Sequence, residues 1–130
     1  MSERIKISSG TKWEGYVGYS RALRVGNVVE VSGTVAVNEN GHIVGKNDPY
    51  AQTRFVLKKI KKALEEAGAK IEDVVRTRIY VSDIKNWEPI GRAHGEVFKD
   101  VKPASTLFEV SQLIGIDYLV EIEATAYIEP

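Results

Sequence analysis

The 130-residue sequence contains no cysteine, no excess of either charge and no long hydrophobic run. The absence of cysteine excludes disulfide bonds, thiolate catalysis and cysteine-based zinc sites. Lysine plus arginine and aspartate plus glutamate both number 18, so the formal net charge is zero. A neutral chain lacks the positive field that holds nucleic-acid phosphates, and a nucleic-acid partner is therefore not expected. Because no stretch resembles a signal peptide or a membrane span, we expect a cytoplasmic protein without membrane contact.

The common signatures of hydrolases and nucleotide-binding proteins are also missing. No GxSxG, GxGxxG or Walker A motif occurs in the sequence. The two histidines, His42 and His94, do not have the spacing of metal ligands. We interpret His94 as a half-buried side chain with its hydrogen bonds satisfied, and we expect neither a metal nor an organic cofactor.

The length and an apolar content of 43% fit one domain over residues 1–130. Alternating and helical periodicities predict an α+β domain with a mixed sheet of about six strands and two helices on one face. Gly26-Asn27 and Asn40-Gly41 are typical two-residue hairpin turns, and Asp48-Pro49 is typical of a helix start. The predicted strands span 4–8, 20–25, 28–35, 74–81, 103–110 and 119–128, and the predicted helices span 49–67 and 86–98.

The periodicity also assigns residues to faces. In the strand 74–81 it places Val75, Thr77, Ile79 and Val81 on one face and Val74, Arg76, Arg78 and Tyr80 on the other. The first helix has an apolar stripe opposite a basic face, which we interpret as solvated (Arg54, Lys58, Lys59, Lys62 and Glu66). The apolar stripe of the second helix consists of Trp87, Ile90, His94, Val97 and Phe98.

Helices on one face leave the other face of the sheet uncovered. That face is predicted to carry Glu30, Arg76, Arg78, Tyr80, Glu121, Glu123 and Tyr127 together with valine and leucine. It is too apolar for water and too charged for a dry core, so we expect contact with further copies of the chain around an axis. Polar clefts would then lie between subunits. For Glu121 and Glu123 taken alone, cross-strand ion pairs with Arg76 and Arg78 are the simpler interpretation.

Four segments together resemble a known family. They read GYSRALRVGNVVEVSGTVAV, AQTRFVLKKIKKALEEAGAKIEDVVRTRIYVSDI, KPASTLFEV and LVEIEATA. Their order and spacing resemble the Rid family, the YjgF-type reactive-intermediate imine/enamine deaminases, over almost the whole chain from Tyr19 onward.

The resemblance implies a chorismate-mutase-like fold and a homotrimer with substrate clefts at the subunit interfaces. It also implies cofactor-free hydrolysis of 2-imino acids, formed from enamines that pyridoxal-phosphate enzymes release, to 2-oxo acids and ammonia. Glu121 matches the family glutamate that positions the attacking water. Tyr19 matches the aromatic residue that lines the pocket, and Ser32-Gly33 matches the strand end beside the substrate. Glu123 keeps the structural role.

The sequence departs from the family at the substrate clamp. Typical members read Pro-Ala-Arg, where the arginine binds the substrate carboxylate, and this chain reads Pro103-Ala104-Ser105. Many members have a cysteine two residues further on, where this chain has Leu107, and the asparagine often found in the second helix aligns with Gly91.

Three interpretations of this departure are open. Arg24, Arg76 or Arg92 replaces the clamp, or the cleft only binds a metabolite. In the interpretation that we favour, a pocket with Ser105, Thr106, Leu107 and His94 accepts a smaller or uncharged imine, enamine or carbonyl compound. A trimer that binds RNA or protein is the alternative from a different functional class.

Overall fold

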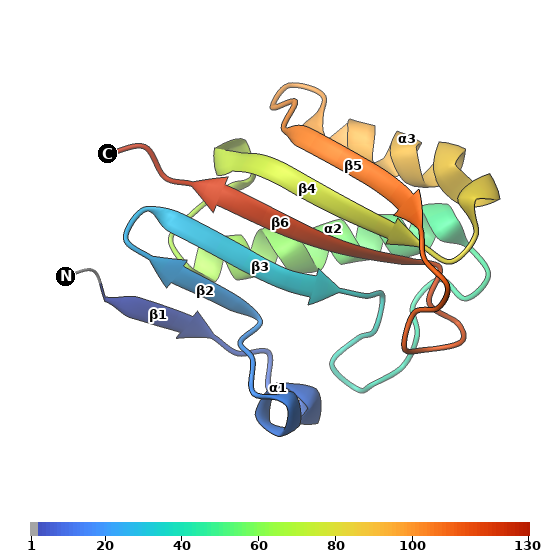
Figure 1. Cartoon of the computed structure of the whole chain (residues 1–130), viewed down its shortest axis with the longest axis horizontal. Helices are drawn as coiled ribbons and strands as arrows, with labels where there is room; N and C mark the ends of the chain where they lie inside the picture. The colour runs from blue at the N-terminus through green and yellow to red at the C-terminus, as the bar shows by residue number, and fades with distance from the viewer. Residues whose placement is uncertain (1–2) are drawn as a thin grey trace.

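The computed structural model describes residues 3–130, which form one six-stranded sheet with two long helices packed on one face (Figure 1). The strands are β1 (Arg4–Ile7), β2 (Ala22–Val25), β3 (Val28–Thr34), β4 (Val74–Val81), β5 (Ala104–Glu109) and β6 (Val120–Tyr127). The helices are α1 (Lys12–Val17), α2 (Pro49–Glu66) and α3 (Trp87–Phe98), and 3-10 turns at Ile71–Asp73 and Ile84–Asn86 precede β4 and α3. None of the helices in the described part of the chain has the length and apolarity needed to cross a membrane.

The strand order is β1-β2-β3-β6-β4-β5. Only β4 and β5 are parallel, and all other neighbouring strands are antiparallel. The last strand of the chain therefore lies in the centre of the sheet, between β3 and β4. This arrangement confirms the predicted α+β class and its mixed sheet.

Helix α2 forms as its sequence signals predict. Asp48 accepts a hydrogen bond from the backbone N–H of Ala51 at 3.0 Å, Pro49 occupies the first turn, and Gly68 ends the helix with a φ of 88°. Its apolar stripe packs on β3 and β6, where alternate residues of β6 are fully buried. Burying a leucine or isoleucine side chain stabilises the fold by about 1.5–3 kcal/mol. The core between sheet and helices consists mainly of Val29, Val31, Val56, Leu57, Ile60, Leu64, Ile79, Ile90, Val120 and Ile122.

Two assignments within the strand and helix patterns were wrong. Val74 pairs with Ala126 and Arg76 with Thr125, so Val75 is an extra residue in a β-bulge. Val74 is consequently buried, and Val75 is 48% exposed. Lys59, predicted on the solvated face of α2, instead turns toward the loop after β3 and donates hydrogen bonds to two backbone carbonyls there.

Two further details differ in the helices. Trp87 was assigned to the buried stripe of α3, but it lies at the first residue of the helix and is 59% exposed. The short helix α1 was not predicted, since its six residues KWEGYV are too few for a periodic pattern. It lies beside the β1–β2 edge of the sheet rather than on the helical layer (Figure 1).

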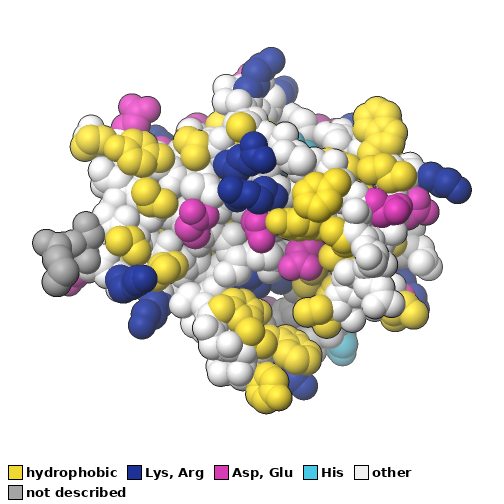
Figure 2. All heavy atoms as spheres, in the orientation of Figure 1, with side chains coloured by type: hydrophobic (Ala, Val, Ile, Leu, Met, Phe, Trp, Pro, Cys, Tyr) yellow, Lys and Arg dark blue, Asp and Glu magenta, His cyan; other side chains and the backbone are white. Residues whose placement is uncertain are grey.

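The face opposite α2 and α3, called the open face below, has the mixed character that the sequence predicts. Basic side chains gather over β4 and β6, with acidic and hydrophobic side chains around them (Figure 2). Arg78 and Glu123 approach to 3.9 Å, which confirms one of the expected cross-strand pairs. Several apolar side chains remain exposed, among them Phe108 and Tyr127 at 44% each.

Candidate functional site

The second residue of β6, Glu121, lies on the open face where β3 ends. Val31 pairs with Ala124 and Thr34 with Ile122, so Ser32 and Gly33 together stand opposite one residue of β6. This bulge brings the backbone of Gly33 against the Glu121 carboxylate. A side chain on Gly33 would overlap with Oε2 of Glu121, so glycine at this position makes room for the carboxylate.

Burial raises the pKa of Glu121 above its ordinary value of 4.5. The positive charge of Arg21 acts in the opposite direction and lowers it, and the negative charge of Glu123 adds to the increase. A carboxyl group with a raised pKa is suited to accepting and returning a proton near neutral pH.

Arg21 lies directly before β2 and is only 9% exposed. Its Nη2 donates a hydrogen bond to the carbonyl oxygen of Gly33 at 2.5 Å. The guanidinium carbon lies 5.8 Å from the centre of the Tyr19 ring, within the range of a cation–π contact. Arg21 therefore connects Tyr19 with the bulge on which Glu121 rests.

A second cation supports the backbone beyond the bulge. Lys59 donates hydrogen bonds from Nζ to the carbonyl oxygens of Val35 at 3.0 Å and of Val37 at 2.9 Å. Burial lowers the pKa of Lys59 to about 8, and the positive charge of Arg21 contributes to the same decrease.

The helix α1 is tied to the start of the chain by a buried carboxylate. Glu14 accepts hydrogen bonds from the side chain of Ser8, from the amide and side chain of Ser9, and from the side chain of Thr11. Burial alone would raise the pKa of Glu14, but the bonds from Ser9 and Ser8 lower it below the ordinary value. The outer surface of α1 is apolar, with Tyr16 exposed at 87%, and it forms the hydrophobic group at the bottom of Figure 2.

Among the hollows of the described surface are two of several hundred cubic ångströms. One, of about 450 Å³, lies between the loop that follows β3 and the loop that precedes β6, at the same end of these strands as Glu121. It is lined by Val37, Gly41, His42, Ile43, Gly115, Ile116, Asp117 and Tyr118.

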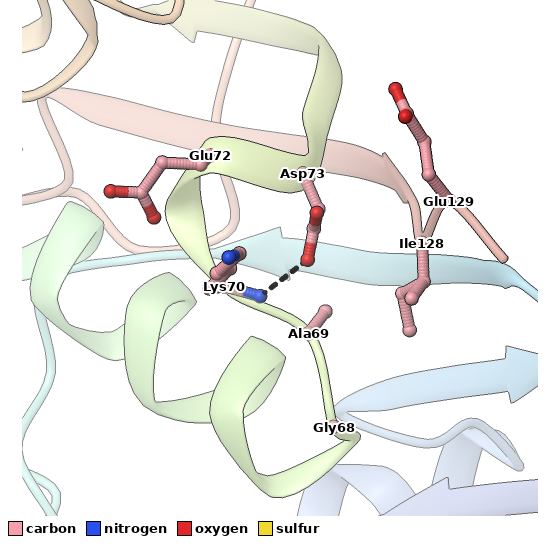
Figure 3. Close-up of a pocket in the computed structure, with 7 residues that line it drawn as sticks. All are labelled: Gly68, Ala69, Lys70, Glu72, Asp73, Ile128 and Glu129. Carbon is pink, nitrogen blue, oxygen red and sulfur yellow. Dashed lines mark hydrogen bonds between the residues drawn. The ribbon is translucent and has the colours of Figure 1, made fainter.

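The other hollow, of about 570 Å³, lies beyond the C-terminal end of α2. Its carboxylates do not converge: Asp73 accepts a hydrogen bond from the backbone N–H of Lys70 at 3.0 Å, and Glu72 and Glu129 point in different directions (Figure 3). We therefore place the candidate site at Glu121 and not here.

Comparison with known proteins shows the family of the chain. The family model described as Endoribonuclease L-PSP, which represents the YjgF/Rid proteins, matches residues 11–128. The chain belongs to the Rid family. Solved Rid structures share the fold: a member of the YjgF/YER057c/UK114 family from Mycobacterium tuberculosis is 45% identical, with a TM-score of 0.88 over 97% of this chain and 100% of that one.

Two further Rid relatives agree with this assignment. A Rid protein of unknown function from Yersinia pestis is 30% identical, with a TM-score of 0.86 over 97% of this chain and 100% of that one. A RutC family protein from Pyrococcus abyssi is 42% identical over 112 residues, which cover 85% of this chain and 87% of the relative. The similarity therefore extends over nearly the full length of the Rid domain.

In this Rid chain, the predicted site residues near the N-terminus and at β6 come together. Glu121 contacts Gly33, and Arg21 links Gly33 to Tyr19. Ser32 belongs to the same bulge, but its hydroxyl donates to the carbonyl oxygen of Ser20 at 2.7 Å. The hydroxyl of Ser32 thus stabilises the turn before β2.

The other predicted residues form a separate group around β5. Thr77 Oγ1 lies 2.8 Å from the Ser105 hydroxyl and 2.9 Å from Nε2 of His94. Leu107 packs against the core, so these side chains lie on the helix side of the sheet, whereas Glu121 lies on the open face. Burial lowers the pKa of His94, which favours its neutral form. The expectation that His94 is half-buried with a satisfied hydrogen bond is confirmed.

Thr106 lies on the open face, where its hydroxyl accepts a hydrogen bond from Arg76 at 2.8 Å. The other two arginines considered as replacement clamps are engaged elsewhere. Arg24 donates to the carbonyl oxygens of Gly26 and Ala67. Arg92 lies over the ring of Tyr50, 4.5 Å from its centre, on the helical layer.

Sequence reasoning missed the two cations beneath the site, Arg21 and Lys59. Arg21 directly precedes Ala22, the buried first residue of β2. Alternation assigns two neighbouring residues to opposite faces, so it gave no signal that both are buried. Lys59 lies on the border between the basic face and the apolar stripe of α2, where a long side chain can turn either way.

Proposed function

We propose that this Rid protein is a cofactor-free hydrolase that deaminates small reactive imines or enamines to carbonyl compounds and ammonia. The observation that carries the proposal is the half-buried Glu121, whose carboxylate rests against Gly33 at the end of β3 and whose pKa is raised by burial. The family membership supports the same reaction class. We further propose that the protein acts as a homotrimer, as the resemblance implies, and in the cytoplasm, as the sequence predicts.

The reaction requires little from the protein besides orientation. An imine carbon is electrophilic, and a water molecule held near it reacts once a base removes a proton. In the proposed mechanism the imine reacts in its protonated, iminium form: the Glu121 carboxylate accepts the proton while the water oxygen bonds to the imine carbon, and the electron pair of the C=N bond moves to the nitrogen, which becomes an amine. Glu121 then gives the proton to this nitrogen. The C–N bond breaks, ammonia leaves, and the hydroxyl proton passes back to the Glu121 carboxylate as the C=O bond forms.

The group around β5, with Thr77, His94, Ser105 and Leu107, is proposed to bind the substrate. Ser105, which stands where the typical deaminases have arginine, is hydrogen-bonded to Thr77 and carries no charge. Because this group lies on the other side of the sheet from Glu121, we propose that a neighbouring subunit brings it to the cleft. The cleft would then favour imines or enamines without a carboxylate over 2-imino acids.

The experiment compares two classes of imine generated in situ. Loss of 2-iminopropionate, which has a carboxylate, and of an aldimine of similar size without one is followed with the wild type, Glu121→Gln and Glu123→Gln. Glu123 is a matched control, since it lies two residues away on the same face and is bound by Arg78 and Tyr80. We expect Glu121→Gln to lose about 100-fold or more in kcat/KM and Glu123→Gln to lose little.

The outcomes separate the proposals. Glu121-dependent hydrolysis restricted to the uncharged imine supports the altered specificity, and rapid hydrolysis of 2-iminopropionate means that another group binds the carboxylate. No acceleration of either compound contradicts the enzymatic function. The alternative function is RNA binding, which is suggested by the description of the family model as an endoribonuclease. It requires that the protein binds single-stranded RNA with an affinity that falls steeply as the salt concentration rises.

A further inference from the structure

The backbone in and after the bulge of β3 is held by two cations, the buried Arg21 and the half-buried Lys59. Gly33 accepts a hydrogen bond from Arg21, and Val35 and Val37 accept hydrogen bonds from Lys59. The pairing of β3 with β6 ends at Thr34, so these bonds stand where strand pairing would otherwise satisfy the carbonyls. The position of the backbone beside Glu121 thus depends on hydrogen bonds from charged side chains.

Arg21 is more deeply buried than its single hydrogen bond explains. Its Nε is inaccessible and has no hydrogen-bond partner in the part of the chain that the structure describes. Over the same residues, 3–130, no carboxylate lies within 4.0 Å of its guanidinium nitrogens. Burial of a charge without a direct ion pair is costly, and a neutral donor would satisfy the Gly33 carbonyl as well. The hydrogen bond to Gly33 therefore does not explain why this buried residue is charged.

Two carboxylates act on Arg21 at longer range, Glu14 from α1 and Glu121 from β6. Glu14 is already saturated by hydrogen bonds from Ser8, Ser9 and Thr11. The Glu121 carboxylate, in contrast, makes no hydrogen bond or ion pair within residues 3–130, as expected for a carboxylate left available to a ligand. Arg21 is thus the fixed cation next to a carboxylate that is free to react.

We propose that Arg21 is the positioning residue of Glu121: it fixes Gly33, against which the Glu121 carboxylate rests, and supplies the positive charge that balances this carboxylate in a half-buried site. The proposal rests on the proposed function, in which Glu121 acts as the base. Nη2 is bonded to Gly33 and Nε is inaccessible, so the proposal assigns Arg21 a role through Glu121.

The proposal fixes the direction of a pH effect. Burial and the charge of Glu123 raise the pKa of Glu121, Arg21 lowers it, and Tyr80 on β4 is the other titratable group that interacts with it. Removal of the Arg21 charge should raise the pKa of Glu121 further. A base is active when ionised, so the acidic limb of the pH–rate profile should move to higher pH.

The test measures the titration of Glu121 directly and needs no substrate. Protein labelled with ¹³C at glutamate side-chain carboxyls is titrated by NMR, and the Glu121 signal is identified by its loss in Glu121→Gln. We compare the wild type, Arg21→Gln, Arg21→Lys and the control Arg24→Gln, which removes a neighbouring charge bonded only to Gly26 and Ala67 among the described residues. We expect a raised pKa of Glu121 in Arg21→Gln and a pKa near the wild-type value in Arg21→Lys and Arg24→Gln.

Kinetics then provide the second measurement. We expect kcat of Arg21→Gln to fall roughly tenfold with a shifted acidic limb, and Arg21→Lys to recover to within about threefold of the wild type. An unchanged Glu121 titration in folded Arg21→Gln overturns the proposal, as does an equal shift in Arg24→Gln. If Arg21→Gln does not fold, Arg21→Met, which removes the charge but keeps a long apolar side chain in the buried position, takes its place: a raised pKa of Glu121 supports the proposal, and an unchanged titration overturns it. If the wild type hydrolyses no imine, the proposed function fails, but the NMR titration still decides the role of Arg21.

Discussion

At the scale of single residues, the site depends on the contact between the Glu121 carboxylate and Gly33, which has no side chain. Glu121 occupies the space in which Gly33 would carry a Cβ atom. Gly33 does not have a positive φ, so the backbone accepts alanine at this position and only the contact with Glu121 opposes it. The geometry of the carboxylate can therefore be changed without altering the carboxylate itself.

We expect Gly33→Ala to reduce kcat/KM for the imine substrate by about 10–100-fold, because the new methyl group pushes the Glu121 carboxylate from its place. Circular dichroism and thermal unfolding check that the fold persists. Gly15→Ala is the control, since a Cβ at Gly15 meets nothing within 4 Å and its φ is also not positive. Full activity of Gly33→Ala would show that hydrolysis does not require the position of the Glu121 carboxylate against Gly33.

The raised pKa of Glu121 also affects stability. A carboxyl group whose pKa is higher in the folded state than in the unfolded state lowers the stability as the pH rises from the unfolded value through the folded one. Glu121→Gln resembles the protonated form and escapes this loss. We expect it to unfold a few degrees above the wild type at pH 7, with the difference disappearing near pH 4, as measured by calorimetry. A lower unfolding temperature at pH 7 would mean that burial does not disfavour the ionised form.

At the scale of elements, the segment that leaves the sheet after β3 is held by α2 through Lys59. The pKa of Lys59 is lowered by burial from the ordinary value of 10.5 to about 8. Between these pH values the unfolded chain binds more protons than the folded one, so this group makes the protein more stable as the pH rises.

The matching variant is Lys59→Met, which keeps the length of the side chain and removes the amine. We expect the free energy of unfolding of the wild type to gain on the order of 1 kcal/mol over that of Lys59→Met between pH 8 and pH 10, a figure reduced for the contact of the side chain with solvent. Urea unfolding at both pH values measures this difference, and tyrosines and other lysines cancel because both proteins contain them. Parallel pH curves would refute the lowered pKa.

The elements differ in how far the sequence predicts them. The bounds of α2 follow from local chemistry, since Asp48, Pro49 and Gly68 act within one turn of the helix. The bulges at Gly33 and Val75 are different, because an extra residue shows only once the partner strand is in place. Alternation carried past Val75 therefore gave the wrong face, and the site contact at Gly33 was accessible only through the family resemblance. The buried position of Arg21 depends likewise on contacts with distant residues.

At the scale of the whole molecule, the mixed composition of the open face is a feature that the single chain leaves unexplained. It combines ion pairs such as Arg78–Glu123 with exposed aromatic side chains. Phe108 meets the ring of Tyr80 edge-on at 5.1 Å yet remains 44% exposed. Exposed apolar area among polar groups is typical of a surface that binds another protein. The proposed occupants are two further copies of the chain.

A charge at this aromatic pair tests the proposed assembly. We expect wild-type protein to sediment with three times the 14.5 kDa mass of the chain, and Phe108→Lys to sediment as a monomer at micromolar concentration because a lysine would be buried without a partner. Glu65→Gln, on the exposed surface of α2, changes the net charge by the same amount and should remain trimeric. If the cleft is shared between subunits, Phe108→Lys loses imine hydrolysis together with the trimer although Glu121 is intact. A monomeric wild type, or a monomeric variant with full activity, would place the whole site within one chain.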